Sequence, residues 1–151
     1  MQKPGTAVLL INKDGHFYLS ERIRDGEPNL WETAGGKIAE GETPEKTIIR
    51  EAKEEANVDL NSGNLIALSD QPHMFGNGVY SYLYIAYIGN DEPQRMEPNK
   101  SLGWQLFGSF ESVPKNQFVD YASVYTPQII QEFHKTQKNK PTIKNASQSK
   151  P

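Results

Sequence analysis

Three glutamates lie close together in the run REAKEEA, at Glu51, Glu54 and Glu55. If this stretch is helical, side chains three and four positions apart project from one face, because successive residues turn by about 100°. Carboxylates at that spacing repel one another and destabilise the helix, so a compensating charge is expected. A hard divalent cation, which prefers oxygen ligands, would supply it. The alternative interpretation is an ordinary solvated helix face.

Residues before this cluster favour the cation site. Gly35 and Gly36 are expected to form a tight turn after a short strand over residues 31–34. They have no side chains, so their backbone can approach a ligand closely and offer a bare carbonyl to a metal ion. Glu42 and Arg50 follow at fixed spacing and add a further carboxylate and a guanidinium. The segment therefore has the groups needed to hold Mg²⁺ and a polyphosphate together.

The helix expected to carry the glutamates covers residues 44–56 and has signals at both ends. Thr43 suits the N-cap, and Pro44 suits the first helical position, where a missing N–H costs nothing. Asn57 can adopt the left-handed conformation that commonly ends a helix. Apolar residues beside the acidic face should pack against a core: Ile48, Ile49, Ala52 and Ala56.

The remaining pattern predicts an α/β fold with a mixed sheet and a second helix. Residues 6–12 and 16–22 are apolar-rich runs around Asp14-Gly15, which is a strong hairpin signal. Further strands are predicted over residues 31–34, 65–69, 79–88 and 104–107, with polar loops over 71–78 and 89–103. Thr126-Pro127 is expected to open a helix that ends near Lys135. Its buried stripe would be Ile129, Ile130 and Phe133.

Length and charge are those of one soluble domain. The chain has 151 residues and a net charge of −3, which predicts a domain over residues 1–136 and a flexible, lysine-rich tail over 137–151. Five of the 16 basic residues fall in the last 17 positions, so residues 1–134 keep 11 basic residues against all 19 acidic ones. An acidic body does not suit duplex nucleic acid. The absence of cysteine is compatible with the cytoplasm, and the apolar run over 7–11 is too short for a membrane span.

The stretch from Gly36 to Val58 resembles the signature of the Nudix hydrolases. That signature reads Gly, five residues, Glu, seven residues, Arg-Glu, an aliphatic residue, any residue, Glu-Glu, any residue, Gly and an aliphatic residue. The matching positions here are Gly36, Glu42, Arg50, Glu51, Glu54 and Glu55. Asn57 stands where the family has Gly, Ala34 stands where a Pro often precedes the glycines, and Ala52 is small for its position. None of these departures removes a candidate ligand. The resemblance implies the Nudix α/β/α sandwich over about residues 5–134.

The resemblance also implies a metal site. Nudix enzymes hydrolyse a nucleoside diphosphate linked to another group, with Mg²⁺ as cofactor and Mn²⁺ as a substitute. The implied metal ligands are the carbonyl of Gly35 and the side chains of Glu51, Glu54, Glu55 and Glu97. Glu97 is the candidate from the loop before the late Trp-containing strand, with Asp91 and Glu92 as rivals. Of these residues, Glu51 and Glu54 are also the catalytic candidates, and Glu51 would act as the base or position it.

Other residues are implied to support catalysis and bind substrate. Arg50 is assigned to catalysis because it would orient Glu51 through an ion pair. Gly36 and Glu42 would hold the shape of the loop. Arg22 would contact phosphate, with Arg24 as its rival. Thr33 and Tyr125 stand where small triphosphate-specific members contact the base.

Three hypotheses about function follow. The leading one is a Mg²⁺-dependent pyrophosphohydrolase that cleaves nucleoside triphosphates, normal or oxidised, to monophosphate and pyrophosphate. The second is hydrolysis of a dinucleotide-type substrate such as NADH, ADP-ribose or a capped RNA end. The third is a Nudix-fold binding module, which the retained Glu51, Glu54 and Glu55 disfavour. The expected partner is a small-molecule nucleotide substrate. Neither duplex nucleic acid nor a membrane is expected to bind, and a homodimer is an open alternative.

Overall fold

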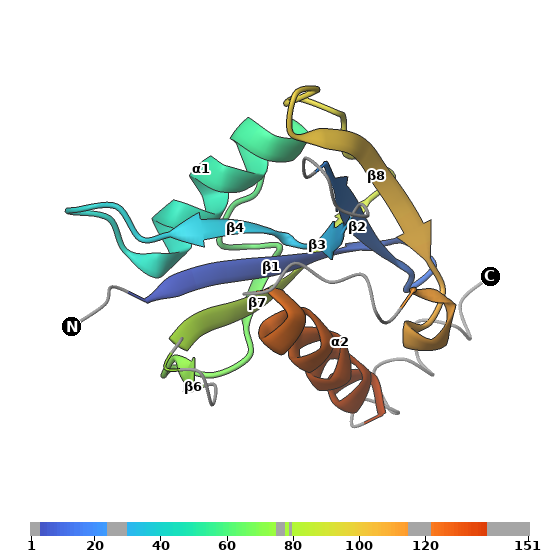
Figure 1. Cartoon of the computed structure of the whole chain (residues 1–151). Helices are drawn as coiled ribbons and strands as arrows, with labels where there is room; N and C mark the ends of the chain where they lie inside the picture. Colours follow the sequence, from blue (N-terminus) through green and yellow to red (C-terminus); the bar gives the residue numbers. More distant parts are fainter. Residues whose placement is uncertain (1–3, 24–29, 75–77, 79, 115–121, 139–151) are drawn as a thin grey trace.

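The computed structural model of this chain describes residues 4–23, 30–74, 78, 80–114 and 122–138. These residues form one mixed sheet between two helices, which is the predicted fold class (Figure 1). The helices are α1 (Pro44–Ala56) and α2 (Ala122–Lys138), with a short 3₁₀ turn, η1 (Phe110–Ser112). The strands are β1 (Gly5–Asn12), β2 (Phe17–Arg22), β3 (Leu30–Glu32), β4 (Ala34–Lys37), β5 (Leu65–Ala67), β6 (His73–Met74), β7 (Tyr80–Gly89) and β8 (Ser101–Phe107).

Strand β1 is the centre of the sheet. The strand order is β3-β2-β1-β7-β5, while β4 pairs with β1, β6 with β7 and β8 with β2. The pairing of β1 with β7 is parallel, and β1 with β2 is the antiparallel hairpin that the sequence predicted. Its turn is held by Asn12, whose Oδ1 accepts hydrogen bonds from the N–H groups of Asp14 and His16, each at 2.9 Å.

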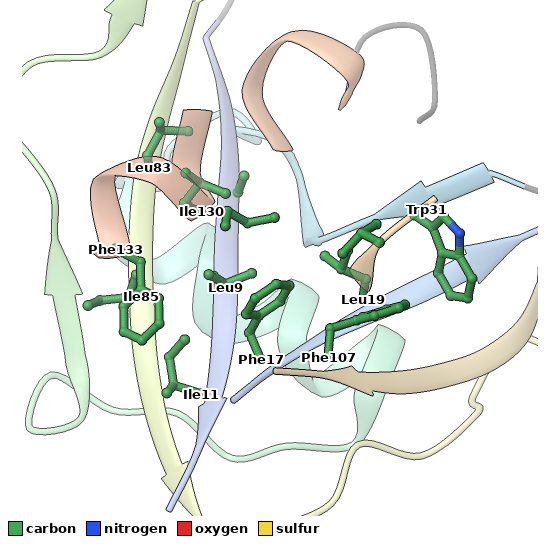
Figure 2. Close-up of a cluster of buried hydrophobic side chains, with 13 residues drawn as sticks. Leu9, Ile11, Phe17, Leu19, Trp31, Leu83, Ile85, Phe107, Ile130 and Phe133 are labelled. Atoms are coloured by element: carbon green, nitrogen blue, oxygen red, sulfur yellow. The ribbon is translucent and has the colours of Figure 1, made fainter. Parts of the chain in front are cut away.

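Both faces of β1 are buried, each under a different helix. Ala7, Leu9 and Ile11 belong to the cluster that α2 covers, and Val8 and Leu10 belong to the cluster under α1. Figure 2 shows the α2-side cluster, where Ile130 and Phe133 lie over Leu83 and Ile85. The predicted stripes of both helices are buried in these clusters, with Ile49 packed against the α1-side cluster from a partly exposed position.

The predicted ends of α1 are confirmed. The side chain of Thr43 accepts a hydrogen bond from the N–H of Lys46 at 3.1 Å, and Pro44 begins the helix. Asn57 ends it in the left-handed region, with φ 54° and ψ 37°. The acidic run therefore lies on a well-defined helix, which is what a preorganised site requires.

The segment around the two glycines differs from the prediction. The sequence predicts one short strand over residues 31–34 that leads into a glycine turn, but the structure has two strands, with β3 paired with β2 and β4 paired with β1. Gly35 and Gly36 lie within β4, opposite Ala7 and Thr6. A Cβ atom on Gly35 would lie 2.1 Å from the carbonyl oxygen of Thr6, and its φ is 149°. Glycine at this position therefore allows two strands to pack closely, and the predicted glycine turn is wrong.

Three other boundaries are corrected. α2 begins at Ala122, so Thr126 is not its N-cap and Pro127 lies inside the helix. Near a helix start, a proline removes one backbone hydrogen bond, so the sequence pattern of a first-position proline is ambiguous. β8 begins at Ser101, which shortens the predicted loop, and β6 forms within the other predicted loop.

The C-terminal helix runs further than expected, to Lys138. Most of the predicted tail, residues 139–151, lies outside the described residues. Among the residues that are described, neither helix is long and apolar enough to cross a membrane.

Candidate functional site

A polar pocket of about 340 Å³ lies beside α1, β2 and β8. Six residues predicted from the sequence line it: Arg22, Thr33, Glu51, Glu54, Glu55 and Glu97. Five further residues of the described part of the chain also line it: Ser20, Glu32, Lys100, Ser101 and Trp104. Helix α1 and the segment after β7 therefore bring four of the predicted carboxylates to one place, although up to 46 residues separate them in the sequence.

Gly35 and Gly36 lie directly against this acidic cluster. The backbone N–H of Gly35 donates to Glu55 Oε1 at 3.1 Å. A Cβ atom on Gly36 would lie only 2.3 Å from Glu51 Oε2. Thr6 fixes β4 from the other side, because its hydroxyl donates to the Gly36 carbonyl at 2.7 Å. The glycines thus allow strand and helix to approach closely, which places two glutamates against the backbone of β4.

Arg50 connects the loop before α1 to the helix itself. Its Nε and Nη2 donate to the two carboxylate oxygens of Glu42, at 2.8 and 3.0 Å. Its Nη1 donates to Glu54 Oε1 at 3.2 Å and lies 3.6 Å from Glu51 Oε2. The ion pair with Glu51 that the sequence suggested is therefore the longest of the three. Hydrogen bonds from Arg50 and then Thr47 hold the pKa of Glu42 at about 2.

Burial disfavours the ionised form of two pocket glutamates, Glu51 and Glu55, and so raises their pKa values. Burial raises the pKa of Glu55 to about 9, and the nearby Glu51, Glu32 and Glu97 add to the effect, while the Gly35 N–H opposes it. Burial also raises the pKa of Glu51, which Glu54 and Glu97 raise further and Arg50 lowers. The site therefore favours a compensating positive charge.

The donors of the pocket fit a hard divalent cation by their chemistry. Within the described ranges, no three acidic or histidine side chains are already arranged as ligands of one ion. The four predicted carboxylates nevertheless share one pocket, and Glu51 and Glu55 have raised pKa values. Oxygen ligands of this kind suit Mg²⁺.

The sequence did not single out several of the lining residues. Ser20 precedes Arg22 by two positions on β2, so the alternation of a strand could have predicted it. Glu32 lies opposite Ser20 in the β2–β3 register, and its Oε1 lies 3.4 Å from Arg22 Nη1. The indole of Trp104 donates to the backbone carbonyl of Glu55 at 3.3 Å, at the end of α1.

Two predicted substrate residues cannot be placed. The side chain of Tyr125 and all of Arg24 lie outside the described part of the structure. The predicted rival Glu92 does not line the pocket, nor does Asp91, as far as the described residues extend.

Comparison with known proteins gives consistent matches. The family profile described as the NUDIX domain matches residues 1–129. An RNA pyrophosphohydrolase of Sphingopyxis alaskensis is 33% identical over 73 residues, which is 48% of this chain and 46% of that protein. The CTP pyrophosphohydrolase of Escherichia coli is 29% identical over 78 residues, or 51% and 57% of the two chains. The chain thus spans about half the length of the curated relatives it matches.

Solved structures support the fold. A MutT NUDIX hydrolase from Burkholderia pseudomallei aligns with a TM-score of 0.60 at 23% identity, covering 81% of this chain and 94% of that chain. A NUDIX hydrolase from Nitrosomonas europaea aligns with a TM-score of 0.68 at 15% identity, covering 90% of each chain.

Proposed function

This chain belongs to the Nudix family, and we propose that it is a pyrophosphohydrolase that cleaves nucleoside triphosphates to nucleoside monophosphate and pyrophosphate with the help of Mg²⁺. The observation that carries the proposal is the convergence of Glu51, Glu54, Glu55 and Glu97 on a pocket that also contains Arg22. A carboxylate cluster holds divalent ions, and a neighbouring guanidinium binds phosphate oxygens.

The residues that would hold Mg²⁺ are Glu51, Glu54, Glu55 and Glu97, together with the carbonyl of Gly35. Mn²⁺ can replace it. A bound ion would supply positive charge that neutralises phosphate oxygens and makes water a better nucleophile.

The protein's own groups then have separate tasks. Glu51 accepts the proton of the attacking water or positions the group that does so, from a pocket wall shared with Glu54 and Glu55. Arg50 keeps the loop and the glutamate face of α1 in register through Glu42 and Glu54. Arg22 contacts phosphate at the wall formed by β2 and β8. Thr33 lines the pocket and is only 8% exposed, and its side chain contacts the nucleoside.

A second candidate substrate is the 5′-triphosphate end of RNA. The observation in its favour is that the matched curated relatives include several RNA pyrophosphohydrolases, from Sphingopyxis, Novosphingobium and Rickettsia. Both substrates offer the same phosphoanhydride to the pocket, so they differ in what lies beyond the first nucleotide.

Product analysis separates these possibilities. The purified protein is incubated with Mg²⁺ and a panel of nucleoside triphosphates, 5′-triphosphorylated RNA, NADH and ADP-ribose. Release of pyrophosphate from free triphosphates supports the first proposal, and release only from RNA supports the second. Turnover confined to NADH or ADP-ribose would contradict both. The Glu55→Gln variant is the control for contaminating hydrolases, because it should lose turnover on every member of the panel.

A further inference from the structure

The segment between β7 and β8, residues 90–100, is anchored to elements that border the acidic pocket. The backbone N–H of Gln94 donates to the carbonyl of Ala56 at 2.8 Å, at the C-terminal end of α1. The backbone N–H of Ile23, directly after β2, donates to the carbonyl of Lys100 at 2.8 Å. Because both anchors are backbone hydrogen bonds, the path of the segment is fixed independently of flexible side chains.

A clamp inside this segment fixes the turn that carries two pocket side chains. Arg95 donates from Nε to the carbonyl of Ser101 at 2.6 Å and from Nη2 to the carbonyl of Pro98 at 3.0 Å. The N–H groups of Lys100 and Ser101 both donate to the carbonyl of Glu97, at 2.9 and 3.0 Å. As a result, Glu97 and Lys100 line the pocket together.

Arg22 and Lys100 are the cationic side chains among the described residues that line the pocket, and Lys100 has the longer ion pair of the two that follow. Arg22 Nη1 lies 3.4 Å from Glu32 Oε1. Lys100 Nζ lies 3.9 Å from Glu97 Oε2, beyond hydrogen-bond distance, and its side chain is 60% exposed. A long, exposed ion pair contributes little to stability. Lys100 can therefore exchange Glu97 for another anion at little cost.

The place of Lys100 suits a phosphate group. The glutamates of α1 form the acidic side of the pocket, whereas Arg22 and Lys100 lie on the side of β2 and β8, where Arg22 is in register with Ser101. If a divalent cation bound to the substrate lies beside the glutamates of α1, the substrate still has phosphate oxygens whose negative charge is not neutralised. A lysine ammonium binds phosphate as a compact point charge with freely rotating donors.

We propose that Lys100 binds a phosphate group of the substrate and gives up its ion pair with Glu97 when it does so. This inference rests on the proposed function and adds a binding residue that the sequence did not indicate. Exchange of partners also leaves Glu97 without its cation when substrate enters, so that this carboxylate is available to the acidic cluster.

The test compares Lys100→Met and Lys100→Arg with a matched control, Lys53→Met. Lys53 is an exposed lysine of α1 whose Nζ lies 2.9 Å from Asp59 Oδ1, away from the pocket lining. Lys100→Met should weaken binding of a non-hydrolysable triphosphate analogue, measured by calorimetry, by roughly tenfold and raise KM equally, with kcat nearly unchanged. Lys100→Arg should restore most of the affinity, and Lys53→Met should leave it unchanged. Unchanged analogue affinity in Lys100→Met would overturn the proposal.

A double-variant cycle separates direct binding from an effect through Glu97. If Lys100 binds phosphate itself, Lys100→Met should lower the affinity for the analogue by the same factor in a Glu97→Gln background as in the wild-type protein. If Lys100 only holds Glu97 in place, the substitution has no effect in that background, and the inference is wrong. Failure of the proposed function would appear differently, as a wild-type protein that turns over no triphosphate, while the binding experiment would still report on Lys100.

Discussion

Replacing Gly36 by alanine should displace the carboxylate of Glu51, a proposed catalytic group, without unfolding the protein. The new Cβ atom would lie 2.3 Å from Glu51 Oε2 and 2.9 Å from Glu51 Cδ. Non-bonded heavy atoms prefer about 3.5 Å, so the carboxylate must move by about 1 Å. Gly36 is not among the glycines with positive φ, so alanine is compatible with its backbone. The displaced atoms are the end of a flexible side chain, so the free energy of unfolding should change by less than about 1 kcal/mol.

The expected loss is catalytic. A misplacement of about 1 Å in an active site costs on the order of 100-fold in rate. At about 1.36 kcal/mol for each factor of ten, this corresponds to roughly 2.7 kcal/mol of transition-state stabilisation. The measurements are steady-state turnover of the best triphosphate with saturating Mg²⁺ and urea unfolding of the same samples.

Two neighbouring glycines provide matched controls. Alanine at Gly5 would make only ordinary contacts, at 3.6 Å from Ser81 Oγ and 3.9 Å from the Gly36 carbonyl oxygen, so both readouts should stay near wild type. The Cβ atom of an alanine at Gly35 would lie 2.1 Å from the carbonyl oxygen of Thr6, and the φ angle of Gly35 is 149°. The free energy of unfolding of Gly35→Ala should therefore decrease by about 3 kcal/mol. Wild-type turnover in Gly36→Ala, or a loss that merely follows its unfolded fraction, would refute the reasoning.

Three further outcomes are expected. Glu55→Gln should lower kcat by about a thousandfold or more and keep its fold, because the amide oxygen can still accept from the Gly35 N–H; near-wild-type turnover in the folded variant would remove Glu55 from the site. With Mg²⁺ chelated, the pKa of Glu55 is about 9 in the folded state, against 4.5 for an ordinary glutamate. Between these two pH values the folded protein keeps a proton on Glu55 that the unfolded chain loses. Stability is then greatest near the acidic end of the window and decreases as pH rises through 9. Thermal unfolding from pH 5.5 to 9.5 should show this slope, Mg²⁺ should flatten it, and a metal-free stability that increases with pH would contradict the assignment. Deleting residues 139–151 should leave turnover on free nucleotides nearly unchanged, and a large loss in a kinetic assay would assign the tail a role in the reaction.

Local sequence signals were sufficient where a single residue type determines the structure. The ends of α1 followed from Thr43, Pro44 and Asn57, because capping and left-handed backbone depend on the residue itself. The glutamate face of α1 followed from helical periodicity alone. Glu97 was named from the resemblance to the Nudix family and not from a local pattern, and the backbone anchors of its segment bring it to the same pocket as the glutamates of α1.

Tertiary packing decided the features that the sequence did not reveal. Gly35 and Gly36 follow a short strand as turn glycines would, and only the approach of Thr6 and Glu51 explains why they lie in β4. Lys100 is one exposed lysine among many until the turn around Glu97 brings it to the pocket. Pro127 is compatible with more than one helical position, so the start of α2 depended on its surroundings.

The hydrogen bond between the indole of Trp104 and the end of α1 places an intrinsic fluorophore at the edge of the acidic pocket. Of the 2 tryptophans in the chain, Trp31 is 5% exposed in the cluster under α2, against Phe107. Trp104 instead borders the pocket and holds the carbonyl of Glu55. In a Trp31→Phe variant, tryptophan fluorescence therefore comes from a single indole beside the glutamates, and a change in its emission on addition of Mg²⁺ or nucleotide would report binding at the pocket.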